Sequence, residues 1–148
     1  MSTANRGKTA EAAVRKVLAA KASADFCWAR WPDMHSGSRQ PAPSDFITCW
    51  QGRLVLLEVK EVDSASRLPY KNFDTAQIAR MRSWVMAGAT AYALVYFSKS
   101  EEWFMASVNW FHENHRLEVN GKAVGSWDMA NEKRWPKKEL QKLLETYL

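Results

Sequence analysis

Three stretches of the chain repeat apolar residues every three or four positions, which is the spacing of one helix face. The first predicts a helix from about Thr9 to Ala22. The second predicts a helix that begins at Phe73 or Asp74, where Asp74 is a good N-cap, and ends near Gly88. The third predicts a last helix that begins at Pro136. The apolar positions that define these helices are Ala10, Ala13, Val14, Val17, Leu18, Ile78, Met81, Val85, Leu140, Leu143, Leu144 and Tyr147.

Strand patterns lie between the predicted helices. Asp45 to Trp50 and Arg53 to Glu61 read as two strands joined by the tight turn Gln51-Gly52. Ala91 to Phe97 is a nearly continuous apolar run, typical of a strand buried on both faces. Trp103 to Val108 predicts the next strand.

The remaining segments are expected to form loops and turns. Pro, Gly and Ser interrupt Trp31 to Ser44, and a second loop runs from Val62 to Asn72. Asn109 to His115 predicts a short helical turn, and Asn120-Gly121 is a strong hairpin signal. The order of helix, hairpin, helix, strand and strand predicts an α/β fold with a central mixed sheet flanked by helices. We expect a single domain over residues 1–148, with a short protruding loop at about 31–44.

Composition narrows the class of protein. The chain has 148 residues, of which 47% are hydrophobic, with a net charge of +5. The charge favours a polyanionic partner, and nucleic acid is favoured over a membrane surface because the first helix lacks bulky apolar anchors. No long apolar run predicts a membrane span, and Met1 to Lys8 has no apolar core of a secretory signal. We therefore expect a cytoplasmic protein with no membrane partner and no organic cofactor.

The cysteines and histidines do not suggest a zinc site. Cys27 and Cys49 stand far apart in the sequence, and we expect plain buried thiols in a reducing compartment. His112 and His115 have the spacing of one helix face, but no further ligand cluster accompanies them. We therefore expect His112 and His115 to be solvated side chains that bind no metal.

The hairpin turn brings three charged residues together. If Gln51-Gly52 is the two-residue loop, Asp45 faces Glu58 across the pair of strands. Side chains alternate along a strand, so Lys60 lies on the face of Glu58. Neighbouring carboxylates repel unless a cation lies between them, and hard oxygen ligands suit Mg²⁺ or Mn²⁺. The backbone carbonyl of Val59 is a further candidate ligand, and Lys60 is placed to orient the attacking water or to offset transition-state charge.

Each of these residues also has a purely structural interpretation. Glu58 and Lys60 could form a solvated cross-strand pair. They follow an apolar run, however, and a charge buried there is costly unless it is paired. Glu11 flanks the apolar face of the first helix and could point toward the metal, or could pair with Arg15 at i,i+4. Gln77, one turn into the second helix, could reach phosphate or water, or could be a surface glutamine.

At these residues the chain resembles a known family. Ser44-Asp45-Phe46 and Leu57-Glu58-Val59-Lys60 resemble the PD-(D/E)XK nuclease signature, with Ser44 where the variable proline stands. Further matches narrow the resemblance to RecU-type Holliday junction resolvases. These matches are Asn5-Arg6-Gly7, Leu68-Pro69, Asn72-Phe73, Gln77 and Met81. The resemblance runs from Asn5 to about Phe111, the tail after about Asn120 has no counterpart in it, and Trp31 to Ser44 is shorter than the family's stalk.

The resemblance implies a restriction-endonuclease-like fold and a homodimer that makes paired, symmetric nicks in four-way DNA junctions with Mg²⁺ or Mn²⁺. It implies Asp45 and Glu58 as metal ligands and Lys60 as the catalytic lysine, with Glu11 and Gln77 completing the site. The short stalk suits a compact, phage-encoded or otherwise reduced relative that works in a bacterial or host cytoplasm.

Basic residues near the predicted site are candidate DNA contacts, because loops that flank an active site commonly bind phosphate. The candidates are Arg6 in the N-terminal motif, Lys8 and Arg15 on the first helix, and Arg30, Arg39, Arg67 and Lys71 in or beside the two long loops. A solvated basic face explains the first-helix residues nearly as well. Two other functions stay open: a PD-(D/E)XK nuclease without junction selectivity, and a non-catalytic DNA-binding protein on the same fold.

Overall fold

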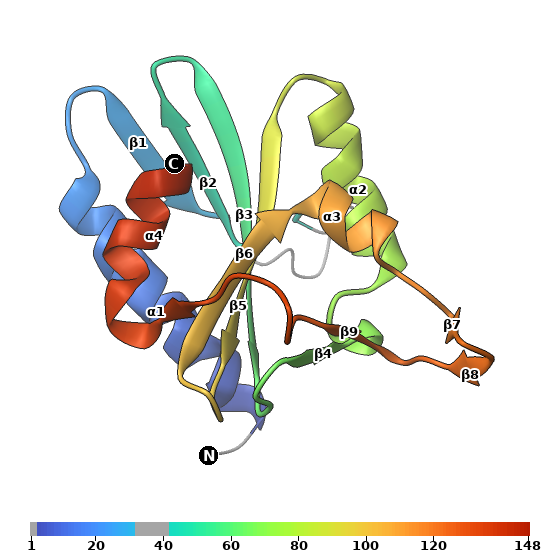
Figure 1. Ribbon diagram of the computed structural model, residues 1–148. Coiled ribbons are helices and arrows are strands. Elements are labelled where there is room, and N and C mark those ends of the chain that lie inside the picture. Colours follow the sequence, from blue (N-terminus) through green and yellow to red (C-terminus); the bar gives the residue numbers. More distant parts are fainter. Residues whose placement is uncertain (1–2, 32–41) are drawn as a thin grey trace.

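The computed structural model describes residues 3–31 and 42–148, and the side chains from Thr9 onward. Its centre is a mixed six-stranded sheet (Figure 1) with the strand order β1-β2-β3-β5-β6-β10. Only β3 and β5 run parallel within this sheet; the other neighbours are antiparallel. The strands are β1 Phe26–Arg30, β2 Phe46–Trp50, β3 Arg53–Val62, β5 Thr90–Phe97, β6 Glu102–Ser107 and β10 Trp135–Pro136.

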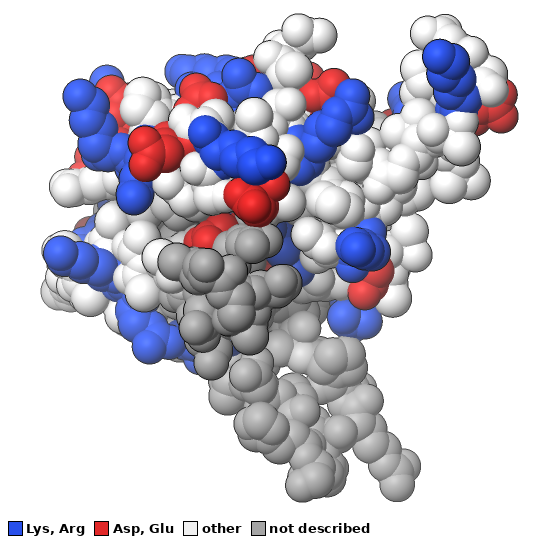
Figure 2. Space-filling model, turned by 90° about the horizontal axis from the view of Figure 1, so that it is seen from below, with Lys and Arg blue, Asp and Glu red and all other residues white. Residues whose placement is uncertain are grey.

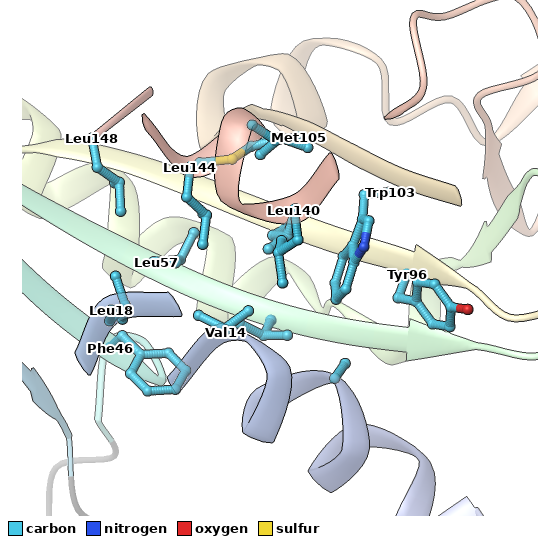
Figure 3. Packing of buried hydrophobic residues seen from close by; sticks show 14 of the residues in the cluster. Val14, Leu18, Phe46, Leu57, Tyr96, Trp103, Met105, Leu140, Leu144 and Leu148 are labelled. Carbon is cyan, nitrogen blue, oxygen red and sulfur yellow. The ribbon is translucent and has the colours of Figure 1, made fainter. Parts of the chain in front are cut away.

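Helices cover both faces of the sheet (Figure 1). One face packs against α1, Thr3–Lys21, and α4, Leu140–Tyr147. The other face packs against α2, Thr75–Met86, and α3, Val108–Glu113. Figure 3 shows the first of these cores, in which apolar side chains of α1 and α4 meet those of the central strands. The predicted α/β fold with a mixed sheet between helices is confirmed.

Alternation along β3 decides which face each residue serves. Leu57 and Val59 belong to the core under α1 and α4, whereas Leu56 belongs to the core under α2 and α3. Because side chains alternate between the two faces of a strand, Glu58 and Lys60 point toward the α2 face. The charged residues of the predicted site therefore lie on the side of the sheet that α2 covers.

Smaller elements complete the molecule. β4, Arg67–Pro69, pairs with the distant β9, Ser126–Asp128, and a 3₁₀ helix follows over Tyr70–Asn72. β7, Glu118–Val119, and β8, Lys122–Ala123, form the hairpin predicted at Asn120-Gly121. No helix in the described part of the chain is long and apolar enough to cross a membrane.

Some sequence-based boundaries were wrong. The first helix starts at Thr3, before the predicted Thr9. The sequence analysis missed β1, a short edge strand, and β4 lies inside the loop predicted from Val62 to Asn72. Pro136 belongs to β10, where the missing N–H of proline is tolerated, and the last helix begins only at Leu140.

Candidate active site

The β2–β3 hairpin sets the geometry of the site. The strands pair from Trp50↔Arg53 beside the turn to Phe46↔Leu57, which is the predicted register. Gln51 and Gly52 both have positive φ, 49° and 81°, as a two-residue hairpin turn of matching twist requires. Register in a hairpin follows from the turn, so the turn also decides which side chains meet at the far end.

At that far end Asp45 and Glu58 lie against one another. The Asp45 N–H donates to Glu58 Oε1 at 3.0 Å, and the Val59 N–H donates to Asp45 Oδ2 at 2.8 Å. Glu58 is 5% exposed, so its charge is almost removed from water. The predicted convergence of the two carboxylates is therefore present in the structure.

Lys60 and Gln77 close the site from the α2 side. The Lys60 Nζ lies 2.8 Å from Glu58 Oε2 and donates to Gln77 Oε1 at 3.3 Å. It also lies 5.4 Å from the centre of the Phe73 ring. Asp74 caps α2 by accepting a hydrogen bond from the Gln77 N–H, which fixes the first turn from which Gln77 points. Gln77 is thus a half-buried contact of Lys60.

Arg30 joins Glu11 to the same centre from the α1 side. Its Nε lies 3.1 Å from Glu11 Oε2, and another guanidinium nitrogen lies 3.4 Å from Asp45 Oδ1. Arg30 also donates to the backbone carbonyls of Trp31 and Asp45. Glu11 therefore pairs with Arg30, 19 positions away, and its link to Asp45 runs through the guanidinium.

The pKa of Asp45 is raised by its burial and by the negative charge beside it. Burial and the neighbouring Glu58 carboxylate raise it to about 8 from an ordinary value of 3.8, and Glu11 adds to the rise. The Val59 amide and the Arg30 guanidinium lower it, but by less. Buried carboxylates in this state favour an added cation, which would stabilise the ionised form of Asp45.

The donor atoms suit a hard divalent cation. Carboxylate oxygens of Asp45 and Glu58 lie together, and the Val59 C=O points to the same edge of β3 as its N–H, which meets Asp45. Within residues 9–31 and 42–148, no three acidic, histidine or cysteine side chains form a ready cluster. Two carboxylates, one backbone carbonyl and water resemble the partly hydrated shell that Mg²⁺ keeps in proteins. The residues present therefore fit Mg²⁺ or Mn²⁺.

A separate cavity of about 420 Å³ lies on the α1 side of the sheet, lined by residues that include Thr9, Glu61, Tyr96 and Lys137. It contains none of the residues that meet at Asp45. The carboxylate centre thus lies outside this cavity.

The predicted DNA contacts are distributed unevenly. Arg15 is exposed on α1, Lys71 is exposed, and Arg67 is exposed while pairing with Asp128 at 3.2 Å. Arg30 ends β1 beside the first long loop, as expected, but its guanidinium is engaged by Glu11 and Asp45 in the carboxylate centre. Arg39 and the side chains of Arg6 and Lys8 lie outside the described part of the chain.

Arg80 on α2 is a further candidate contact that the sequence analysis did not name. It follows Gln77 by three positions on α2, so the two side chains are neighbours on one helix surface. Its Nε is buried, and no hydrogen-bond partner for it exists among the described residues. The i,i+3 spacing to Gln77 was the signal available in the sequence.

Charge does not outline a nucleic-acid interface on the face seen from below (Figure 2). Figure 2 looks at the molecule from below and shows Lys and Arg side chains interspersed with Asp and Glu side chains over the visible part of this face. The visible part of this face therefore does not present a continuous basic surface.

The sequence is similar to two proteins named as Holliday junction resolvases. Holliday junction resolvase RecU of Streptococcus suis (strain 05ZYH33) is 24% identical over 86 residues, which are 58% of this chain and 42% of that protein. Holliday junction resolvase RecU of Ligilactobacillus salivarius (strain UCC118) is 28% identical over 67 residues, which are 45% of this chain and 32% of that protein. The matches thus span less than half the length of these relatives.

A solved structure supports the fold. Hjc of Archaeoglobus fulgidus, a Holliday junction resolvase, superposes with a TM-score of 0.51 at 18% identity, covering 82% of this chain and 88% of that one.

The model of the family RecU, Recombination protein U, matches residues 33–142. This match extends beyond Asn120, so the tail that the sequence analysis left without a counterpart is largely within the family pattern. The chain belongs to the RecU family.

Proposed function

We propose that this protein is a metal-dependent endodeoxyribonuclease that resolves four-way DNA junctions. The observation that carries the proposal is the meeting of Asp45, Glu58 and Lys60 at one buried end of the hairpin. Membership of the RecU family and the resolvase names of its relatives support junction DNA as the substrate. In this proposal the protein acts as a homodimer that makes paired nicks, in the cytoplasm of a bacterium or of a phage-infected host.

The proposed chemistry assigns each residue a position around the scissile phosphate. When bound, Mg²⁺ or Mn²⁺ lowers the pKa of water and polarises the phosphate. Asp45, Glu58 and the Val59 carbonyl would hold the metal ion. The Lys60 ammonium, held by Glu58 and Gln77, would orient the attacking water and offset charge that develops on the phosphate.

Arg30 and Glu11 act as positioning residues in this proposal. Arg30 contacts the Asp45 carboxylate and its backbone carbonyl at once, which limits how far this carboxylate can rotate. Glu11 fixes Arg30 from α1. The pair would hold Asp45 in the orientation needed for metal binding without contacting the substrate.

Two alternatives differ in substrate or activity. A PD-(D/E)XK nuclease that cuts flaps or plain duplex would use the same residues, and only substrate preference separates it from a resolvase. A DNA-binding protein without catalysis would not need two carboxylates and a lysine in one buried cluster, because burying charged groups costs free energy. The intact Asp45, Glu58 and Lys60 argue for an active enzyme.

A substrate panel tests the proposed function. Labelled four-way junction, flap and duplex DNA are incubated with the protein in Mg²⁺, Mn²⁺ or EDTA, with Glu58→Ala in parallel. We expect paired cuts in the junction that need metal and are lost in the variant. Equal cutting of all three substrates would replace the resolvase by a general nuclease, and metal-independent cutting would reject the site.

Arg80 provides a test of DNA binding separate from catalysis. If Arg80 contacts a phosphate, Arg80→Ala should lower the affinity for any DNA about 5- to 10-fold, because the contact is lost. The slope of log affinity against log salt concentration should fall by about one. Junction binding is measured in EDTA, where no cleavage occurs.

Lys142→Ala is the matched control, because Lys142 is exposed on α4 in the opposite layer of the molecule. It should bind junction DNA as the unmodified protein does. An unchanged salt slope in Arg80→Ala would show that this arginine does not contact phosphate.

A further inference from the structure

The two cysteines occupy an unexpected position. Cys27 on β1 and Cys49 on β2 are both free and exposed, which corrects the expectation of buried thiols. They are also direct partners in the antiparallel register of β1 and β2. Although they are 22 positions apart in the sequence, the sheet places the two thiols opposite one another.

The strand geometry brings the thiols to the same face. Phe26 and Trp28 pack into the core under α1, so Cys27 points to the other face of β1. Its partner Cys49 shares that face, because directly opposed residues point the same way. This edge of the sheet lies outside the cover of α2, and both side chains meet solvent.

The register puts the Cα atoms of the two cysteines within the range of a disulfide. The Trp31 N–H donates to the Asp45 carbonyl at 2.8 Å, which marks these two as a hydrogen-bonded pair of the ladder. Such pairs recur at every second position, so Cys27 and Cys49 form another one. The Cα atoms of a hydrogen-bonded antiparallel pair lie about 5.5 Å apart, within the range that a disulfide spans. Their Cβ atoms start at about the same separation, whereas a disulfide needs about 3.5–4.5 Å, so closure requires the edge strand β1 to shift toward β2 by about 1 Å.

We propose that Cys27 and Cys49 form a cross-strand dithiol that closes to an intramolecular disulfide by exchange with a small disulfide such as oxidised glutathione. One thiolate attacks a glutathione sulfur, which forms a mixed disulfide and releases one reduced glutathione. The second thiolate attacks the protein-bound sulfur, forms the Cys27–Cys49 bond and releases the second. Two protein thiols are oxidised, one glutathione disulfide is reduced, and the two thiol protons end on glutathione.

The disulfide would link the edge strand β1 covalently to β2. Among the described strands, β1 is hydrogen-bonded to β2 alone. Arg30 ends β1 and Asp45 precedes β2, so the crosslinked strands are those that carry the Arg30–Asp45 ion pair. Closing the loop between the two cysteines would limit separation of these strands. This inference does not depend on the proposed nuclease activity.

Mass spectrometry of the full chain tests the linkage. The reduced protein is treated with oxidised glutathione, and the remaining thiols are alkylated. We expect a monomer that has lost two hydrogens, takes no alkyl group and yields a linked peptide pair containing Cys27 and Cys49. The midpoint of thermal unfolding should rise by on the order of 5–10 °C and return on reduction.

Three variants make the result specific. Cys27→Ser and Cys49→Ser should stop at the glutathione mixed disulfide. Cys27→Ser combined with Ala29→Cys keeps an exposed thiol on the same face but moves it two residues out of register, and should link to Cys49 far more slowly. Two alkylated thiols or two glutathione adducts on the untouched chain, linkage only between molecules, or equal linkage out of register would overturn the proposal.

Discussion

Replacing Lys60 by methionine is expected to lower the rate of junction cleavage about 100- to 10,000-fold while leaving junction affinity close to that of the unmodified protein. The Lys60 ammonium lies 2.8 Å from Glu58 and within hydrogen-bond distance of Gln77, so its position is fixed before substrate binds. A fixed charge of this kind acts mainly on the transition state, because it needs no reorganisation during the reaction. Methionine keeps the length of the side chain but removes the charge.

Single-turnover cleavage of a labelled junction in Mg²⁺ measures this effect. Lys99→Met is the control, because Lys99 is exposed in the turn between β5 and β6 and should leave the rate unchanged. Thermal unfolding in Mg²⁺ establishes that the Lys60 variant is folded. A rate within about threefold of the unmodified protein would remove Lys60 from the catalytic machinery.

Replacing Asp45 by asparagine is expected to stabilise the metal-free protein at alkaline pH while abolishing cleavage. The pKa of Asp45 is raised on folding from 3.8 to about 8, so the folded chain holds a proton that the unfolded chain has released. The folded state binds more protons in this interval, and the free energy of unfolding therefore falls as the pH rises from about 4 to about 8. Asparagine cannot ionise and escapes this loss.

Urea unfolding of both proteins in EDTA across this pH range measures the difference. Each unit by which folding raises the pKa of Asp45 corresponds to about 1.4 kcal/mol of unfolding free energy. The gain of the asparagine variant is smaller than the full sum, because water partly reaches Asp45 and because asparagine weakens the contact with Arg30. We expect the advantage of Asp45→Asn to grow by about 2–4 kcal/mol from the acidic to the alkaline end. A difference that stays constant with pH would show that burial and Glu58 do not raise the pKa of Asp45.

The sequence was sufficient to predict the hairpin half of the site. A two-residue turn ending in Gly52 fixes the register, and the two-residue period of a strand then decides that Asp45, Glu58 and Lys60 share a face. Both facts are local, so they can be read without knowing the rest of the fold. The capping of α2 by Asp74 is local in the same way.

The contribution of Arg30 could not be predicted, because it depends on a pairing that no local pattern encodes. β1 is short, half-exposed and separated from β2 by a long segment, and only its place in the sheet brings Arg30 between Glu11 and Asp45. The exposure of Cys27 and Cys49 could not be predicted for the same reason, because it also depends on the place of β1 in the sheet. Their facing positions follow from the β1–β2 register and not from their spacing in the chain.

Binding of Mn²⁺ tests the central claim most directly, that Asp45 and Glu58 form a metal site. The signal of free Mn²⁺ in electron paramagnetic resonance is followed while protein is added above about pH 8, where Asp45 is ionised. The account predicts loss of the free signal with the unmodified protein and with Glu118→Gln, whose carboxylate is exposed on β7, but not with Asp45→Asn or Glu58→Gln. No binding by the unmodified protein, or equal binding by all four proteins, would contradict it.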